Sequence, residues 1–143
     1  MLLKQFEHGR TYMIKLDYQT DLYEELNKIC IKENIKAGFI NVIGAVSSLK
    51  TGFFDQNTKE YICTTYAYDE PMEIVSCMGN ISIKDNKSNC HLHITAADRK
   101  GRCIGGHLVA GTSIYAAEVV IQELLGEDLV RELDDTTKLT LWQ

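Results

Sequence analysis

Two histidines, His91 and His93, are spaced so that they could share one ligand. They lie in Cys90 to Ala97, a segment whose aliphatic and β-branched residues predict a strand. Side chains on a strand alternate between its two faces, so both imidazoles emerge on one face while Leu92 and Ile94 turn to the core. Their Cα atoms would be about 6.5 to 7 Å apart, a separation from which two imidazoles can converge on a metal ion.

Whether a third histidine, His107, joins them depends on the register of the next predicted strand, Arg102 to Val109. A two-residue hairpin loop would turn His107 to the opposite face of the sheet. A three-residue loop over residues 99–101 would place His107 opposite His93, and this loop class prefers a glycine at its last, left-handed position. Gly101 occupies that position, so the turn chemistry favours the register that gathers all three imidazoles.

The neighbouring pair Gly105 and Gly106 is predicted to line this site, because it leaves room for an ion, solvent or another bound cofactor. A bulge at the same pair would alter the register. Three neutral imidazoles with an open fourth position match the coordination of catalytic zinc, although nickel, copper or iron accept similar donors. The alternative interpretation is that the three are polar, partly buried histidines that hydrogen-bond across a sheet.

Catalysis would also require a general acid or base near the metal, and the spacing of the sequence identifies none. Glu73, Asp98 and Glu118 are candidates, but each is equally explained as a structural or solvent-facing residue. Cys90 or Cys103 could supply a thiolate as a nucleophile or a fourth ligand, although strand alternation turns Cys90 toward the core. The catalytic residues and the fourth ligand therefore stay open.

The elements that must position these residues indicate an α+β fold with a mostly antiparallel sheet. Asp21 can cap one main helix at about residues 21–34, in which Glu24 completes a capping box and apolar side chains recur on one face. A short C-terminal helix is expected at about residues 125–133. The remaining strands are expected at Thr11 to Leu16, Ala37 to Val46, Leu49 to Phe54, Tyr61 to Tyr66, Met72 to Met78, Asn80 to Lys84, Thr112 to Glu123 and Lys138 to Trp142. The pattern of Thr112 to Glu123 also fits a helix, but its enrichment in Thr, Ile, Tyr and Val favours a strand.

Length and composition predict one domain over residues 1–143, since 45% hydrophobic content supplies a core and no Gly, Ser or Pro tract interrupts the chain. The five cysteines are odd in number and lack a Cys-x-x-Cys pair, which favours reduced thiols and a cytoplasmic location. We find no apolar run long enough to span a membrane. A formal charge of -5 disfavours direct binding to nucleic acid.

Seven short motifs, in this order along nearly the whole chain, resemble the stand-alone prokaryotic type of the PPC (plants and prokaryotes conserved) domain. The pairing of His-x-His with a downstream Gly-Gly-His-Leu is the most specific of these features. The motifs are Gly9-Arg10, Ile43-Gly44-Ala45, Glu70-Pro71-Met72-Glu73-Ile74, Gly79-Asn80-Ile81, His91-Leu92-His93, Gly105-Gly106-His107-Leu108 and Ala117-Glu118-Val119.

The resemblance implies an α+β subunit that assembles as a homotrimer, with His91, His93 and His107 aligned to a cluster that can hold a metal, with zinc expected. Plant relatives join the domain to AT-hooks, Arg-Gly-Arg-Pro elements that enter the DNA minor groove. The Gly-Arg pairs at residues 9–10 and 101–102 lack the second arginine and the proline of that element, so the DNA-binding function of the plant relatives is not expected here.

The leading hypothesis is therefore a homotrimeric, zinc-binding module for association or regulation, whose partners are copies of itself and, in addition, other proteins or a small ligand. Two alternatives remain. One is a small metal-dependent enzyme that uses the three-histidine site, and the other is an accessory DNA-binding protein.

Overall fold

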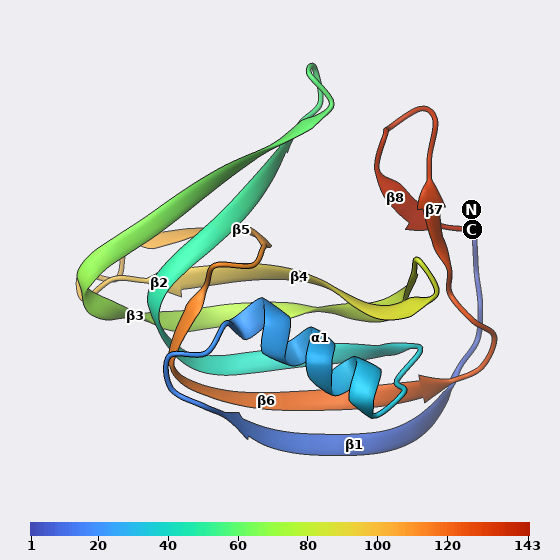
Figure 1. The fold of residues 1–143 in the computed structure, drawn as a ribbon, viewed down its shortest axis with the longest axis horizontal. Coiled ribbons are helices and arrows are strands. Elements are labelled where there is room, and N and C mark those ends of the chain that lie inside the picture. Colours follow the sequence, from blue (N-terminus) through green and yellow to red (C-terminus); the bar gives the residue numbers. More distant parts are fainter.

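The computed structural model describes residues 1–143, apart from the side chain of Tyr68. One antiparallel sheet of six strands, in the order β1-β6-β2-β3-β4-β5, carries a single helix, and a separate hairpin of two short strands lies near the C-terminus (Figure 1). This arrangement confirms the α+β fold class. In chain order the elements are β1 (Glu7–Leu16), α1 (Leu22–Lys32), β2 (Gly38–Asp55), β3 (Glu60–Lys84), β4 (Lys87–Ala97), β5 (Cys103–Leu108), β6 (Ser113–Leu125), β7 (Arg131–Leu133) and β8 (Thr140–Trp142).

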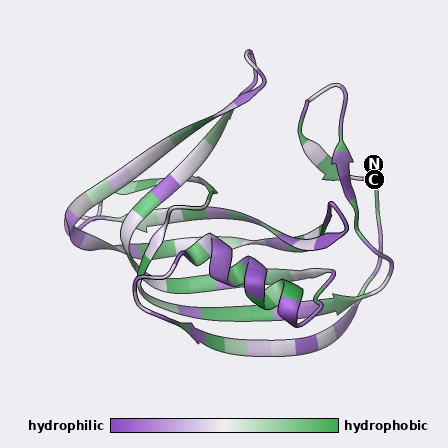
Figure 2. Ribbon diagram, in the orientation of Figure 1, coloured by the Kyte–Doolittle hydropathy of each residue, from purple (hydrophilic) through white to green (hydrophobic). Residues whose placement is uncertain are grey.

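Helix α1 begins where the sequence predicts. The Asp21 carboxylate accepts a hydrogen bond from the backbone N–H of Glu24 at 2.9 Å, which satisfies one of the free donors of the first turn. Leu22, Leu26 and Cys30 are fully buried against the sheet, and Figure 2 shows hydrophobic and hydrophilic residues alternating along the helix. The helix spans 11 residues, too few for a segment that crosses a lipid bilayer, and no other helix occurs in the described chain.

Strand β2 is long enough to belong to two parts of the sheet. Its first half pairs with β6 and with the second half of β3, whereas its second half pairs with the first half of β3 and with β5. The pairs Thr51 with Leu108 and Gly52 with His107 close β2, β3, β4 and β5 into a ring of strands. The second half of β2 and the first half of β3, residues 48–67, form a β2–β3 arm that rises beside β5 in Figure 1.

The β4–β5 hairpin has the predicted register, with His107 directly opposite His93. Backbone bonds between Asp98 and Arg102 (3.0 Å) and between Gly101 and Asp98 (2.8 Å) close the three-residue loop. Gly101 has φ of 74°, the left-handed conformation that the loop requires. The Asp98 carboxylate accepts from two backbone N–H groups of the same turn and thereby rigidifies it.

The predicted short helix at residues 125–133 is wrong. Strand β6 continues to Leu125, a turn follows, and β7 pairs with β8, so α1 is the single helix of the described chain. The leucines at 125, 129 and 133 have helical spacing, yet only Leu129 is buried. A helix there would therefore gain little stability from packing against the sheet. Backbone bonds to the sheet are formed instead, including Ile83 N–H to the Leu129 carbonyl at 2.8 Å. The closing strand predicted at Lys138 to Trp142 is confirmed as β8.

Replacing Gly101 by valine should lower the free energy of unfolding by about 1 to 2 kcal/mol, because an L-residue is strained in the left-handed region. A side chain at this position would meet no atom within 4 Å, so the effect should be purely conformational. Gly101→Asn is the matched control and should lose less, since asparagine tolerates this conformation. Urea denaturation of the three proteins measures the difference, and equal stabilities would contradict the assigned turn.

Candidate metal centre

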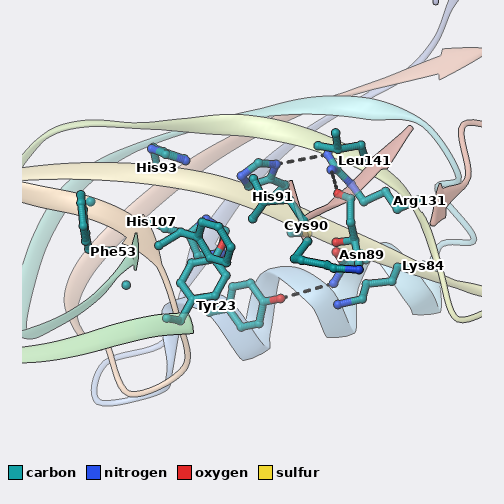
Figure 3. A pocket seen from close by; sticks show the side chains of 17 residues that line it. Tyr23, Phe53, Lys84, Asn89, Cys90, His91, His93, His107, Arg131 and Leu141 are labelled. Carbon is teal, nitrogen blue, oxygen red and sulfur yellow. Dashed lines mark hydrogen bonds between the residues drawn. The ribbon is translucent and has the colours of Figure 1, made fainter. Parts of the chain in front are cut away.

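Three imidazoles converge on one face of the β4–β5 hairpin, as the sequence predicts. His91 and His93 come from β4 and His107 from β5, and a ligand nitrogen of each lies within 4.8 Å of the others. The ring centroids are separated by 5.4 Å for His91 and His93, 4.9 Å for His91 and His107, and 5.5 Å for His93 and His107. His91 and His107 are half-buried and His93 is exposed (Figure 3).

This donor set fits a transition metal held by nitrogen ligands. In a tetrahedral zinc site with Zn–N bonds of 2.0 to 2.1 Å, the ligand nitrogens are about 3.4 Å apart, so the widest pair must close by roughly 1.4 Å. Rotation of the rings can supply that movement, since His93 is exposed. The Nδ1 atom of His107 is buried and has no hydrogen-bond partner among the described residues. A buried polar atom without a partner is unfavourable, and a bound metal at the cluster would satisfy it.

The protonation of the cluster also suits a metal. Burial, together with the positive charge of Arg131 and the two neighbouring histidines, lowers the pKa of His91 to about 4. Burial likewise lowers the pKa of His107, with contributions from His93, Arg131 and Lys84. At neutral pH both rings are therefore unprotonated, and an imidazole must be unprotonated to donate a lone pair to a metal.

Arg131 of β7 is the residue that sequence reasoning missed. Its guanidinium donates to Ser82 Oγ at 2.7 Å, Asn80 Oδ1 at 2.8 Å and the Thr140 carbonyl at 3.0 Å, and it lies 5.3 Å from the Trp142 ring centroid. It also reaches His91 Nδ1 at 3.2 Å, the dashed contact in Figure 3. The leucine spacing around it predicts a helix, so no local signal places it beside the histidines.

A cavity of about 610 Å³ opens beside the three rings. Gly106 lines this cavity and Gly105 does not. A Cβ atom at Gly105 would collide with the Ile94 carbonyl oxygen of β4. Tyr61 stands over Gly52 with its ring 5.4 Å from that of His107. The cavity therefore has a polar side at the imidazoles and an aromatic side from the β2–β3 arm.

None of the three candidate acids or bases lies in this cavity. Asp98 is bonded to Arg102 at the far end of the hairpin, and that contact lowers its carboxyl pKa. Glu118 lines a different depression on β6, and Glu73 is exposed on β3. The structure thus brings the predicted metal ligands together and leaves the predicted carboxylates elsewhere.

The two cysteines near the hairpin are not placed as reactive groups. Cys90 Sγ is buried 3.6 Å from Cys30 Sγ, and the interaction with Cys30, together with burial, raises the pKa of its thiol. The core position predicted for Cys90 is confirmed. Cys103 is exposed at the start of β5 and does not line the cavity.

Known proteins share this fold and sequence pattern. The family model of the Plants and Prokaryotes Conserved (PCC) domain matches residues 3–125. A metal-containing protein from Archaeoglobus fulgidus is 38% identical, with a TM-score of 0.93 over 100% of this chain and 99% of its own. A plant- and prokaryote-conserved (PPC) protein from Pyrococcus horikoshii is 33% identical, with a TM-score of 0.92 over 100% of this chain and 97% of its own.

A similar segment also occurs inside a much longer protein. The chain is 32% identical over 130 residues to the bifunctional protein GlmU of Synechococcus sp. (strain JA-3-3Ab). That match covers 90% of this chain but 19% of GlmU, so the chain spans about a fifth of the length of this relative.

In the metal-free protein, the His91 ring should titrate with a midpoint near 4, well below the value of about 6.5 for a free histidine. Because the unfolded state then binds the extra proton, the free energy of unfolding should fall as the pH is lowered from about 6.5 toward 4. His91→Gln should flatten this dependence. Imidazole NMR titration and urea denaturation with a chelator present measure both effects, and a midpoint at or above 6.5 would refute the assigned environment.

Proposed function

This chain belongs to the Plants and Prokaryotes Conserved (PCC) domain family, also written PPC, and from that premise we propose that it is a zinc-binding association module. One observation carries the proposal: three imidazoles lie with their ligand nitrogens within 4.8 Å of one another, and a buried nitrogen of one of them has no partner in the described chain. The metal-containing relative from Archaeoglobus fulgidus supports the same conclusion. Three protein ligands, such as three histidines, with an open fourth position are typical of zinc sites that bind a further ligand.

The surface next to the histidines supports self-association, which we propose to produce a homotrimer. The outer face of the sheet exposes large apolar side chains, including Met13, Phe39, Ile43 and Met78. A single row of residues crosses the strands on this face and ends at the histidines, since each residue in the row is the cross-strand partner of the next. The row is Met13, Val120, Asn41, Met78, His93 and His107.

An apolar face of this kind usually marks a protein interface, since soluble chains rarely leave such a patch uncovered. The related segment within the longer Synechococcus protein is consistent with a module that serves association and can be joined to another chain. We therefore assign the outer face to copies of this chain.

A second candidate function, a small metal-dependent enzyme, is favoured by the cavity of about 610 Å³ beside the open side of the cluster. A zinc ion bound there would act as a Lewis acid on a ligand oxygen. No carboxylate lines the cavity, so proton transfer by this chain alone would depend on the histidine, tyrosine and lysine side chains that line it. Turnover of any member of a broad metabolite panel by zinc-loaded protein, lost in His93→Ala, would establish this activity.

Native protein should carry one zinc per chain, and His91→Ala, His93→Ala and His107→Ala should each weaken zinc binding by more than about 100-fold. His8→Ala is the matched control, because His8 is the remaining histidine and lies exposed on β1, away from the cluster. Elemental analysis gives the stoichiometry and competition with a chelator gives the affinity. Full zinc content in the His91, His93, His107 triple alanine variant would refute the site.

Light scattering coupled to size exclusion should give three times the 16.2 kDa of one chain. Ile43→Glu should shift the protein toward the monomer by placing a charge on the outer face, where Ile43 is 55% exposed. Ile31→Glu is the control, since Ile31 is 50% exposed but lies on α1. A wild-type monomer at all working concentrations, or equal effects of the two substitutions, would contradict this interface.

A further inference from the structure

The guanidinium of Arg131 is half-buried without a counter-charge. The hydrogen-bond partners of its guanidinium among the described residues are a hydroxyl, an amide, a backbone carbonyl and an imidazole, all of them neutral. Ser82, the hydroxyl partner, is fully buried. A partly buried charge is usually paired with an opposite charge, because desolvation is otherwise uncompensated. Arg131 is thus held rigidly at the edge of the cavity with its charge available to a ligand.

The rest of the cavity has the same sign. Lys84 and Lys138 also line it, and Lys84 makes no ion pair in the described chain, whereas Lys138 lies 3.1 Å from Asp135. No aspartate or glutamate lines this cavity, although the chain has 20 acidic residues against 15 basic ones. A zinc ion at the histidines would add two further positive charges. The cavity therefore selects an anion despite the net negative charge of the protein.

Metal binding must also change the contact between Arg131 and His91. An arginine can only donate hydrogen bonds, so His91 Nδ1 accepts, and the proton of the neutral ring is on Nε2. If the metal binds Nδ1, it takes the lone pair that Arg131 uses. If the metal binds Nε2, the proton moves to Nδ1 and faces the arginine donor. Either way this hydrogen bond would be lost on metal binding, and an Arg131 N–H at the edge of the cavity would become available to a ligand.

We propose that the cavity binds a small organic carboxylate with an apolar body. Its carboxylate lies beside the three imidazoles, where a bound metal would attract it, and accepts a hydrogen bond from Arg131. The planar guanidinium matches a carboxylate, and the aromatic residues Phe53 and Tyr61 receive the apolar body. The volume of about 610 Å³ is within the usual range for a small-molecule site. This inference rests on the proposed zinc site and specifies what that site binds.

The test uses benzoate as the probe, benzamide as its neutral analogue and inorganic phosphate as a second anion, with calorimetry on zinc-loaded and metal-free protein. Zinc content is measured separately on every sample. Benzoate should bind zinc-loaded protein at least about tenfold more tightly than benzamide or phosphate binds the same protein. It should also bind zinc-loaded protein at least about tenfold more tightly than it binds metal-free protein. Imidazole nitrogen NMR should show His91 Nδ1 unprotonated without metal and changed on zinc loading.

Arg131→Gln should weaken benzoate binding by about tenfold while zinc content stays at one per chain. Arg99→Gln is the control, because Arg99 is exposed and paired with Glu70 at the far end of the hairpin. Lys84→Gln is a second test in case the Arg131 variant misfolds, because the Lys84 side chain has no hydrogen-bond partner in the described chain to lose. This substitution should also weaken benzoate binding.

The outcomes separate the two proposals. Zinc that fails to bind overturns the metal site and this inference with it. Zinc that binds, with benzoate no tighter than benzamide or unaffected by both Arg131→Gln and Lys84→Gln, overturns the carboxylate site alone. Phosphate that binds more tightly than benzoate overturns the assignment to carboxylates.

Discussion

The candidate site depends on the register between β4 and β5. Opposed residues of an antiparallel pair share a face, so the pairing of His93 with His107 is what turns the third imidazole toward the other two. The hydrophobic core fixes the same register independently, because Leu108, the next residue along β5, is fully buried. A slip by one residue would expose that side chain, which costs about 1.5 to 3 kcal/mol, and would bury an imidazole in its place. Loop chemistry and core packing therefore select one arrangement together.

The features predicted correctly from the sequence were those with a local signal. The cap at Asp21 and the glycine of the β4–β5 loop each act within a few residues, so the sequence alone indicates where α1 and this hairpin lie. The His-x-His spacing has the same local character. The convergence of the three imidazoles was predictable because one strand and one turn position all three of them.

The features that were missed depend on contacts between distant segments. The helix predicted at residues 125–133 relied on leucine spacing, but a helix there finds no surface to cover, and the backbone bonds to the sheet instead. That change places Arg131 on a strand beside Asn80 and Ser82, about 50 positions earlier in the sequence. The pairing of β2 with β5, which brings Tyr61 over His107, is equally non-local. Propensity and periodicity carry no information about either contact.

Under the proposed function, the outer face of the sheet links the metal centre to self-association. His93 is the most exposed of the three ligands, and its direct neighbour across β3 is the exposed Met78. An interface that covers Met78 would also reduce the solvent around His93 and restrict its rotation, so less conformational entropy is lost when the ring binds a metal. Because linkage is reciprocal, a metal bound more tightly by the assembled form must in turn stabilise that form by the same free energy. The three histidines lie at the end of the row of residues on the outer face, so their position can couple metal binding to self-association. Histidines on an isolated loop would lack this connection.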